Sequence, residues 1–150
     1  MRNIIDLFDG EYAFLSNFYL CKVTYNGIEY KHSEGAFQAQ KTLNEQERAY
    51  IASLSPGQSK RKAGRHGVIS LRADWEEVKD QIMYEVVLAK FKQNPDLREK
   101  LLNTGNAILI EGTTWHDNYW GNCTCDRCAN KFGRNQLGKT LMKVREELKG

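Results

Sequence analysis

The stretch CKVTYNGIEYKHSEGAFQAQKT, residues 21–42, contains the clearest structural signals in the chain. In its first half, apolar and polar residues alternate on both sides of Asn26-Gly27, and both of these residues tolerate a positive φ. This pattern predicts a tight β-hairpin. In the second half, Ser33 is a suitable N-cap for a helix that begins there. We therefore expect a hairpin that leads directly into a short helix.

The predicted helix carries a polar stripe. Glu34, Gln38 and Lys41 are spaced at i, i+4 and i+7, so they share one face, and Phe37 lies beside them. Such a stripe is usually a solvent-exposed face. The functional alternative is one wall of a binding site, because the helix N-terminus favours the ionised form of a carboxylate in the first turn. This stretch alone leaves both interpretations open.

The rest of the chain is also predicted to be mostly helical. Further helices are predicted at residues 44–54, after Pro56, after Asp74, from Asn94-Pro95 to near Gly105, and at the C-terminus. Glu77 follows Asp74 at the spacing of a capping box. The segment 107–112, AILIEG, predicts one short strand. The expected fold class is α+β, mostly α, with a small β-hairpin or sheet, and residues 1–150 are expected to form a single compact domain.

Composition sets limits on the function. The chain has 150 residues, of which 41% are hydrophobic and 27% are charged, and its net charge is +3. This mild positive charge permits a phosphate-bearing ligand but does not by itself indicate nucleic acid. No apolar run approaches the roughly 18 residues needed to cross a bilayer, so we expect no membrane partner. Without a recognisable signal peptide we expect a cytoplasmic protein with reduced cysteines.

Two aromatic segments are candidates for chemistry. Trp75 directly follows the predicted Asp74 cap, where it could stack on a flat base or pack into the core. The segment TTWHDNYWGN, 113–122, concentrates two Trp, a Tyr, a His and an Asp. Asp117 is a candidate carboxylate there, and His116 is the alternative acid–base group. The structural alternative is a loop whose aspartate only makes turn hydrogen bonds.

Basic and cysteine-rich segments complete the candidates. The run KRKAGRHG, 60–67, includes Arg65 and is dense enough to hold phosphate, although most such runs are solvated. The segment CTCDRC, 123–128, could bind zinc if His116, Cys21 or another residue supplied a fourth ligand. Zinc sites usually show two complete pairs of ligands, so the sequence favours three reduced loop cysteines and no metal.

Five motifs then occur in order: FLSNFY, SEGAFQAQK, DWEEVK, NYWG and GRNQLGKTLMKVREEL. Together they resemble the YbiA-like, or NADAR, family over most of the chain, from about Phe14 to Leu148. The resemblance implies a compact α-rich domain with N-glycosidase activity on ribosylated compounds. Some members are associated with riboflavin-pathway intermediates and others with removal of ADP-ribose from guanine. Where the family often has a Gly-rich loop after Y-W-G, this chain has its cysteine triplet.

The resemblance also implies site residues. The family's functional positions fall on Glu34, Trp75 and Asp117, which we therefore predict to be catalytic. Substrate contacts are predicted from Phe37, Gln38, Lys41, Arg65, Trp120 and Asn17. We expect no cofactor and no metal.

Breaking a bond between a base and ribose C1′ builds positive charge on the sugar, which a fixed carboxylate stabilises. Lys41 has a second possible role, as a Schiff-base nucleophile toward the opened ribose. The predicted partner is a phosphorylated riboside or an ADP-ribosyl compound, with ADP-ribosylated DNA as an alternative. The rival function is a module that binds ADP-ribose or NAD without turnover.

Overall fold

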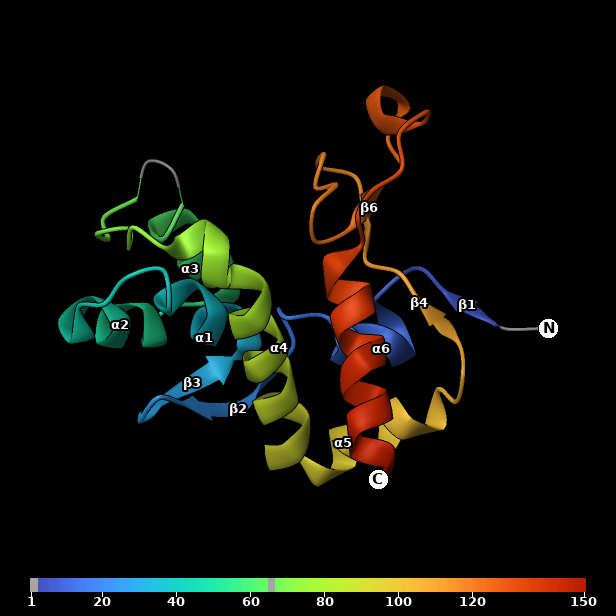
Figure 1. The fold of residues 1–150 in the computed structure, drawn as a ribbon, viewed down its shortest axis with the longest axis horizontal. Coiled ribbons are helices and arrows are strands. Elements are labelled where there is room, and N and C mark those ends of the chain that lie inside the picture. The colour runs from blue at the N-terminus through green and yellow to red at the C-terminus, as the bar shows by residue number, and fades with distance from the viewer. Residues whose placement is uncertain (1–2, 65–66) are drawn as a thin grey trace. The chain divides into compact units, whose positions relative to one another are not determined.

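The computed structural model describes residues 3–64 and 67–150, and the chain forms two compact units (Figure 1). One unit comprises Asn17–Pro95, and the other combines Met1–Ser16 with Asp96–Gly150. Helices predominate, and the strands pair as three two-stranded sheets in the described part of the chain. The predicted α+β, mostly helical class is therefore confirmed. That residues 1–150 behave as a single domain stays a prediction.

The predicted hairpin is present in the Asn17–Pro95 unit. Strand β2 (Leu20–Tyr25) pairs antiparallel with β3 (Ile28–His32), and Tyr25 is opposite Ile28. Asn26 and Gly27 form the turn with φ values of 49° and 82°. Both residues thus adopt the left-handed conformation for which an Asn-Gly pair is suited. The chain leaves β3 and enters helix α1 (Ser33–Ala39) without an intervening loop.

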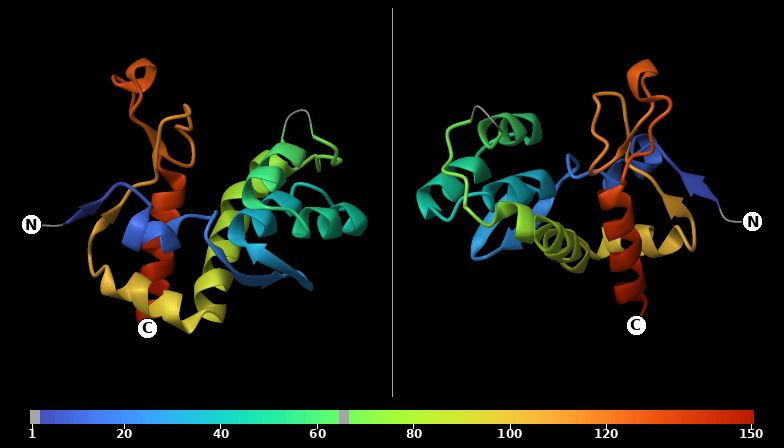
Figure 2. Two further views of the ribbon diagram at one scale, coloured as in Figure 1. Left: turned by 180° about the vertical axis from the view of Figure 1, so that it is seen from behind. Right: turned by 45° about the horizontal axis from the view of Figure 1, so that its top comes forward.

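Helix α1 lies at the centre of this unit. It packs against α2 (Glu45–Ala52), α3 (Pro56–Lys62), α4 (Trp75–Gln93) and both strands of the hairpin, and Figures 1 and 2 show these elements around it. All seven residues of α1 are buried. The interpretation of the polar stripe as a solvent-exposed face is therefore wrong for Glu34 and Gln38, because neighbouring elements cover this short helix. Lys41, the third member of the predicted stripe, lies beyond the end of α1 and is half-buried.

The helix starts were predicted with mixed success. Asn44 caps α2 by accepting a hydrogen bond from the Glu47 amide at 2.9 Å, and Pro56 occupies the first turn of α3, both as predicted. Asp74 occupies the N-cap position directly before α4, as predicted, but its side chain makes no capping hydrogen bond. The carboxylate instead forms a bidentate pair with Arg72, at 2.6 and 3.1 Å, and the Glu77 amide donates to the Asp74 carbonyl at 3.0 Å.

The second unit is built on α6 (Gln136–Lys149), which packs against the short strand β4 (Ile108–Leu109). Strand β4 pairs in parallel with β1 (Ile4–Ile5), which was not predicted. The unit also contains the 3₁₀ helix η1 (Gly10–Leu15) and the helix α5 (Pro95–Asn103). Helix α6 is the helix predicted at the C-terminus, and it buries an apolar stripe that consists of Leu137, Leu141, Val144 and Leu148.

Between residues 112 and 136 the described chain contains only two short strands and a 3₁₀ turn. Strand β5 (Gly112–Thr113) pairs in parallel with β6 (Asn122–Cys123), and a 3₁₀ turn, η2 (Asp126–Cys128), follows. In the second unit these pieces carry Asp117, His116 and three of the four cysteines.

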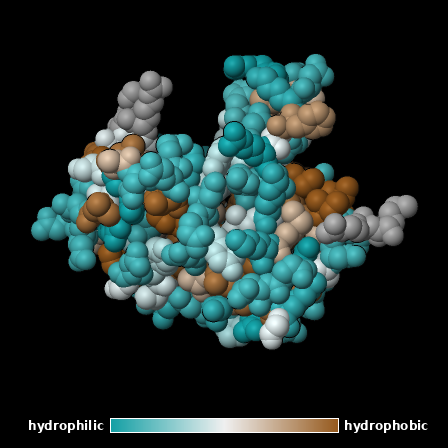
Figure 3. All heavy atoms as spheres, in the orientation of Figure 1, coloured by the Kyte–Doolittle hydropathy of each residue, from teal (hydrophilic) through white to brown (hydrophobic). Residues whose placement is uncertain are grey.

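The surface is mainly hydrophilic on the face shown in Figure 3, where hydrophobic residues form separate patches between hydrophilic ones. Among the described residues, none of the helices combines the length and the apolar character needed to cross a membrane.

Gly138 provides a test of the packing between α6 and β4. A Cβ at this position would fall onto the Leu109 carbonyl oxygen and the Asn135 side chain, and the carbonyl is part of the backbone. We expect Gly138→Ala to lower the free energy of unfolding by about 1–3 kcal/mol, measured by urea denaturation. The control is Gly57→Ala in α3, where the nearest atom is a flexible Arg61 side chain at 3.8 Å. This control should be neutral or more stable by up to about 1 kcal/mol, and equal effects of the two variants would contradict the packing argument.

Candidate active site

The start of α1 is held from two sides. The backbone carbonyl of Asn17 accepts a hydrogen bond from the Glu34 amide at 2.9 Å. The imidazole Nδ1 of His32 accepts from the Gly35 amide at 2.8 Å, and its Nε2 donates to the Leu54 carbonyl at 2.9 Å. These bonds satisfy amides at a helix N-terminus that would otherwise be buried without partners. They also fix the position of the Glu34 backbone.

The predicted cap of this helix is wrong by one residue. His32, not Ser33, is the N-cap, and Ser33 is the first helical residue. The Ser33 hydroxyl instead donates to Oδ1 of Asn17 at 2.9 Å, while Nδ2 of Asn17 contacts the Met83 sulfur at 3.5 Å. All of these contacts of Asn17 are with other residues of the protein. They explain why Asn17 is buried, because it supports the start of α1. Its predicted contact with substrate stays a prediction.

Glu34 and Gln38 form a buried polar pair one helical turn apart. Nε2 of Gln38 donates to Oε1 of Glu34 at 2.9 Å, and the two residues are only 7% and 6% exposed. The other polar atom of the amide, Oε1 of Gln38, has no hydrogen-bond partner among the described residues. A buried acceptor without a donor is uncommon in proteins, and a ligand hydroxyl or amide that reached this oxygen would form a stabilising hydrogen bond.

Lys41 and Trp75 adjoin this pair. The Lys41 ammonium lies 5.8 Å from the centre of the Trp75 ring and donates to the Ala63 carbonyl at 3.3 Å. Phe37 and Trp75 pack with their ring centroids 5.1 Å apart and their planes tilted by 54°. Both rings are buried, so Trp75 has the packing expected of a core residue while also bordering Lys41. Whether Trp75 additionally stacks on a base stays a prediction.

The electrostatic surroundings of Lys41 combine both signs of charge. Burial lowers the pKa of Lys41, and the nearby carboxylates of Glu34 and Glu76 oppose this effect. The ammonium groups of Lys60 and Lys79 are also close enough to lower its pKa further. A neighbourhood of several lysines beside a buried acid is suited to a ligand that has both an anionic group and hydroxyls. Arg65, predicted to contact phosphate, lies outside the described residues.

The predicted second carboxylate belongs to the other unit. Oδ1 of Asp117 accepts hydrogen bonds from the amides of Tyr119 and Trp120 at 3.1 and 3.0 Å, which is an aspartate-capped turn. The carbonyls of Tyr119 and Trp120 in turn accept from the first amides of α6, at 3.0 and 2.9 Å. Trp120 is half-buried and packs edge-on against Tyr119 at 4.8 Å. These bonds hold Asp117 in a defined turn, but the catalytic role of Asp117 and the substrate contact of Trp120 stay predictions.

A second group of side chains lies beside Asp117. His116, Cys123, Cys125 and Cys128 have their ligand atoms within 4.8 Å of one another, and all four belong to the second unit. Cys21, the other candidate fourth ligand, is in strand β2 of the first unit.

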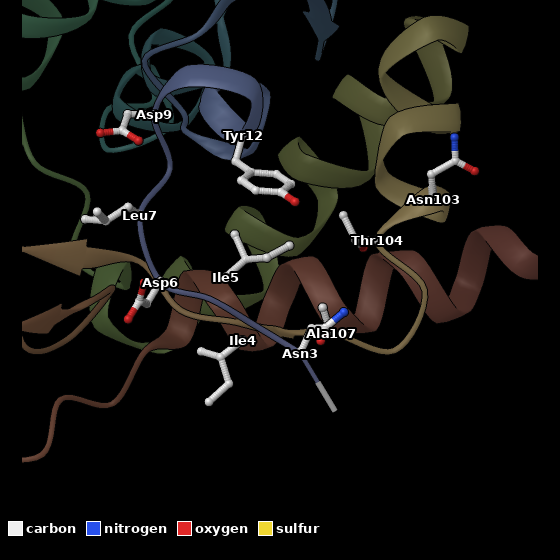
Figure 4. Close-up of a pocket in the computed structure, with 10 residues that line it drawn as sticks. All are labelled: Asn3, Ile4, Ile5, Asp6, Leu7, Asp9, Tyr12, Asn103, Thr104 and Ala107. Atoms are coloured by element: carbon white, nitrogen blue, oxygen red, sulfur yellow. The ribbon is translucent and has the colours of Figure 1, made fainter. Parts of the chain in front are cut away.

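The second unit also contains a cavity of about 510 Å³ between the N-terminal segment and the chain that follows α5 (Figure 4). Its lining consists of residues within 3–12 and 103–107. None of the predicted site residues lines this cavity, so its size alone does not make it the active site.

Sequence reasoning missed one residue that shapes the second unit. Asn135 has a φ of 53°, and its side chain donates to the Leu109 carbonyl and accepts from the Glu111 amide, both at 2.9 Å. It therefore joins the start of α6 to strand β4. Asn is among the residues that adopt the left-handed conformation most readily, and its position in the GRNQLG motif was the available signal.

Comparison with known proteins supports the family resemblance over nearly the whole chain. The model of the NADAR domain matches residues 7–149. The chain belongs to the NADAR family. It is 38% identical over 138 residues to the N-glycosidase YbiA of Escherichia coli, a match that spans 92% of this chain and 82% of that protein. The NMR structure of E. coli YbiA aligns with 99% of this chain and 87% of that one, with a TM-score of 0.81 and 37% identity.

Two further relatives extend this comparison. The N-glycosidase Npun_R5314 of Nostoc punctiforme is 44% identical over 119 residues, which is 77% of this chain and 72% of that protein. The riboflavin biosynthesis protein VVA0006 of Vibrio vulnificus is 34% identical over 93% of this chain, a region that makes up 36% of that protein. This NADAR chain is accordingly an N-glycosidase, a hydrolase of N-glycosyl bonds that acts on a small-molecule glycoside.

His32 makes the stability of this NADAR protein depend on pH. Burial lowers the pKa of His32, which is neutral in the folded state because Nδ1 accepts and Nε2 donates a hydrogen bond. Below the ordinary histidine pKa of about 6.5, the unfolded chain gains a proton that the folded imidazole does not. This contribution to stability is therefore complete above about pH 6.5 and is lost as the pH falls, by up to about 1.4 kcal/mol per pH unit.

Urea denaturation at several pH values between about 7.5 and 5.5 tests this prediction. The variant His32→Asn keeps an acceptor for the Gly35 amide but does not titrate, so its stability should fall less steeply with pH. If the wild-type protein and the variant lose stability with the same slope, the histidine is not responsible.

Proposed function

We propose that this enzyme hydrolyses the bond between a base or amine and ribose C1′ in a phosphorylated riboside, with Glu34 as the principal carboxylate. The proposal rests on the buried Glu34–Gln38 pair. One carboxylate oxygen is bound by the amide, and the amide oxygen at its side has no partner in the described part of the protein. A ribose ring, which presents several hydroxyl donors next to its anomeric carbon, would supply a donor for this Gln38 oxygen.

The chemistry follows from charge. As the base leaves with its bonding electrons, positive charge develops on C1′ and the ring oxygen of the sugar. A carboxylate that is already fixed and desolvated stabilises this charge without reorganising. Water then adds to C1′ and loses a proton, and the departing nitrogen gains one. Glu34 accounts for the charge stabilisation, and Asp117 is the proposed second carboxylate for the proton transfers.

The lysines near the pair favour a substrate with phosphate. Lys41, Lys60 and Lys79 are close enough for the latter two to lower the pKa of the first, so an anion bound among them would relieve their mutual repulsion. A riboflavin-pathway intermediate and ADP-ribosylated guanine both carry phosphate and an N-glycosidic bond. The name of the Vibrio vulnificus relative makes a riboflavin-pathway intermediate the first substrate to test.

Two alternatives to direct hydrolysis are affected differently by these observations. A module that binds ADP-ribose without turnover loses support, because the YbiA and Nostoc relatives are named N-glycosidases. Reaction through Lys41 gains some support, because a lowered pKa increases the fraction of neutral amine that can attack an opened ribose aldehyde. Direct hydrolysis remains the proposal, since it needs no covalent intermediate.

Glu34→Gln tests the main assignment. The variant keeps the side-chain shape and the hydrogen bond with Gln38 but removes the negative charge, so it should lower kcat by roughly 10²–10³-fold with little change in stability. Release of free base is measured with riboflavin-pathway intermediates, NAD and ADP-ribosylated guanosine. The matched control is Glu45→Gln, another first-turn acid but on the exposed start of α2. Wild-type turnover in Glu34→Gln would exclude the assignment.

Asp117→Asn tests the second carboxylate separately. The amide oxygen can still accept the hydrogen bonds from Tyr119 and Trp120, so the turn should persist while the charge is lost. We expect kcat to fall by about 10²–10⁴-fold with substrate affinity retained. Asp96→Asn, at the exposed start of α5, is the control. Unchanged turnover in Asp117→Asn would leave Asp117 as a turn residue only.

A further inference from the structure

Four side chains of the second unit converge on one point. They are the imidazole of His116 and the thiols of Cys123, Cys125 and Cys128, whose ligand atoms lie within 4.8 Å of one another. Nδ1 of His116 is 3.3 Å from Sγ of Cys125 and 3.5 Å from Sγ of Cys128. Each residue presents one soft or borderline donor atom toward the others.

The two nitrogen–sulfur distances match those of a tetrahedral metal site, and all the other separations are at most 4.8 Å. With Zn–S bonds of about 2.3 Å and a Zn–N bond of about 2.0–2.1 Å at tetrahedral angles, nitrogen and sulfur ligands lie roughly 3.5 Å apart, and two sulfurs roughly 3.8 Å apart. Three thiolates and one imidazole are a common ligand set for structural zinc. We propose that His116, Cys123, Cys125 and Cys128 bind one Zn²⁺ ion.

The backbone is arranged to bring the four ligands together. The pairing of β5 with β6, in which Thr113 is opposite Cys123, places Cys123 next to the turn that contains His116. The 3₁₀ turn η2 returns Cys128 to Cys125, and the Cys128 amide donates to the Cys125 carbonyl at 3.0 Å. His116 itself has a φ of 68°, which is unfavourable for a non-glycine residue. Strain of this kind persists where the surrounding structure has a use for it.

The sulfur atoms also have the hydrogen-bond donors expected around metal-bound thiolates. Nδ2 of Asn118 donates to the Cys128 sulfur at 3.3 Å, and the His116 amide donates to the Cys123 sulfur at 3.3 Å. Oδ1 of Asn118 accepts from the Cys123 amide at 2.9 Å, so one side chain supports two of the ligands. Donors of this type stabilise negative charge on sulfur and fix the orientation of the ligands.

One contact must change when zinc binds. Nη1 of Arg127 is 3.4 Å from Nε2 of His116, and this nitrogen carries the proton when Nδ1 coordinates the metal. Arg127 is exposed and can rotate away at little cost. Its positive charge next to a site with three thiolates is favourable in either position.

The proposed site is structural. Four protein ligands complete a tetrahedron and leave no position for water or substrate. Its ligands span residues 116–128, so the metal would connect the turn that carries Asp117 to β6 and η2. Zinc therefore stabilises the loop without taking part in the reaction, and the cysteines serve as ligands and not as catalytic groups.

Metal analysis of the full chain tests the proposal. The protein is produced with zinc in the medium, purified without chelator and desalted. We expect one zinc per chain in the wild type and in Cys21→Ser, which removes the cysteine outside the cluster. Cys128→Ser should lose the zinc, whereas His116→Cys should keep it because a fourth thiolate can replace the imidazole. Reconstitution with Co²⁺ should give the intense d–d absorption of a tetrahedral site together with thiolate-to-cobalt charge transfer.

Several results would overturn the zinc site. These are a wild-type protein without zinc after reconstitution under reducing conditions, iron in place of zinc, a disulfide between two of the three clustered cysteines, or undiminished zinc in Cys128→Ser. If Cys128→Ser does not fold, the cobalt spectrum of the wild type decides the question. Tetrahedral thiolate coordination supports the site, and an octahedral spectrum refutes it.

Discussion

The hydrogen bonds at the N-terminus of α1 are the constraint on which the proposed active site depends. A helix of seven residues buried on all sides has no water to satisfy its first amides. The carbonyl of Asn17 and the imidazole of His32 take this role for Glu34 and Gly35. Gly35 also has to lack a side chain, because a Cβ there would lie 2.8 Å from the His32 ring. The direction of the Glu34 side chain follows from this arrangement.

A carboxylate in such a position costs free energy in the absence of substrate. Removing it from water is unfavourable, and its hydrogen bond from Gln38 and the lysines nearby offset part of that cost. In the proposed reaction, a substrate that becomes positively charged would gain most from this carboxylate. Burial of Glu34 would then serve catalysis through the difference between ground state and transition state, which is the difference that accelerates a reaction.

Local signals in the sequence predicted local structure well. Asn26-Gly27, Asn44 and Pro56 act through neighbours within a few residues, so the hairpin and two helix starts could be predicted. Asp74 lies at the predicted N-cap position, but its carboxylate binds Arg72 instead of a helix amide, and propensity does not record such competition. Strand β4 lies within the strand predicted over residues 107–112, whereas β1 has only two residues and no periodicity, and their parallel pairing joins residues about a hundred positions apart.

The same difference between local and long-range features holds for the candidate site. The pairing of Glu34 with Gln38 could be predicted from helical spacing, but their burial depends on α2, α3 and α4, and Lys41 lies beyond the end of the helix. The Gln38 oxygen that has no partner among the described residues could not be predicted, because it depends on which groups the surrounding elements bring near it. Likewise, the C-x-C-x2-C motif showed three of the proposed zinc ligands. The proposed fourth ligand, His116, precedes the Y-W-G turn and has a left-handed backbone conformation.

The two proposed carboxylates are held by different physical means. Glu34 lies on a helix enclosed by a hydrophobic core, which fixes it through burial. Asp117 lies in a long segment whose strands have two residues each and whose apolar side chains are partly exposed, as with Trp115 at 54% and Phe132 at 99%. Such a segment buries too little apolar surface to offset the entropy of ordering its backbone. Cross-linking by a metal is the usual solution for small, core-poor structures, and the cluster beside Asp117 has the ligands for it. In this chain, metal coordination by the cysteine triplet would thus order the segment that carries Asp117, as packing against neighbouring elements orders α1.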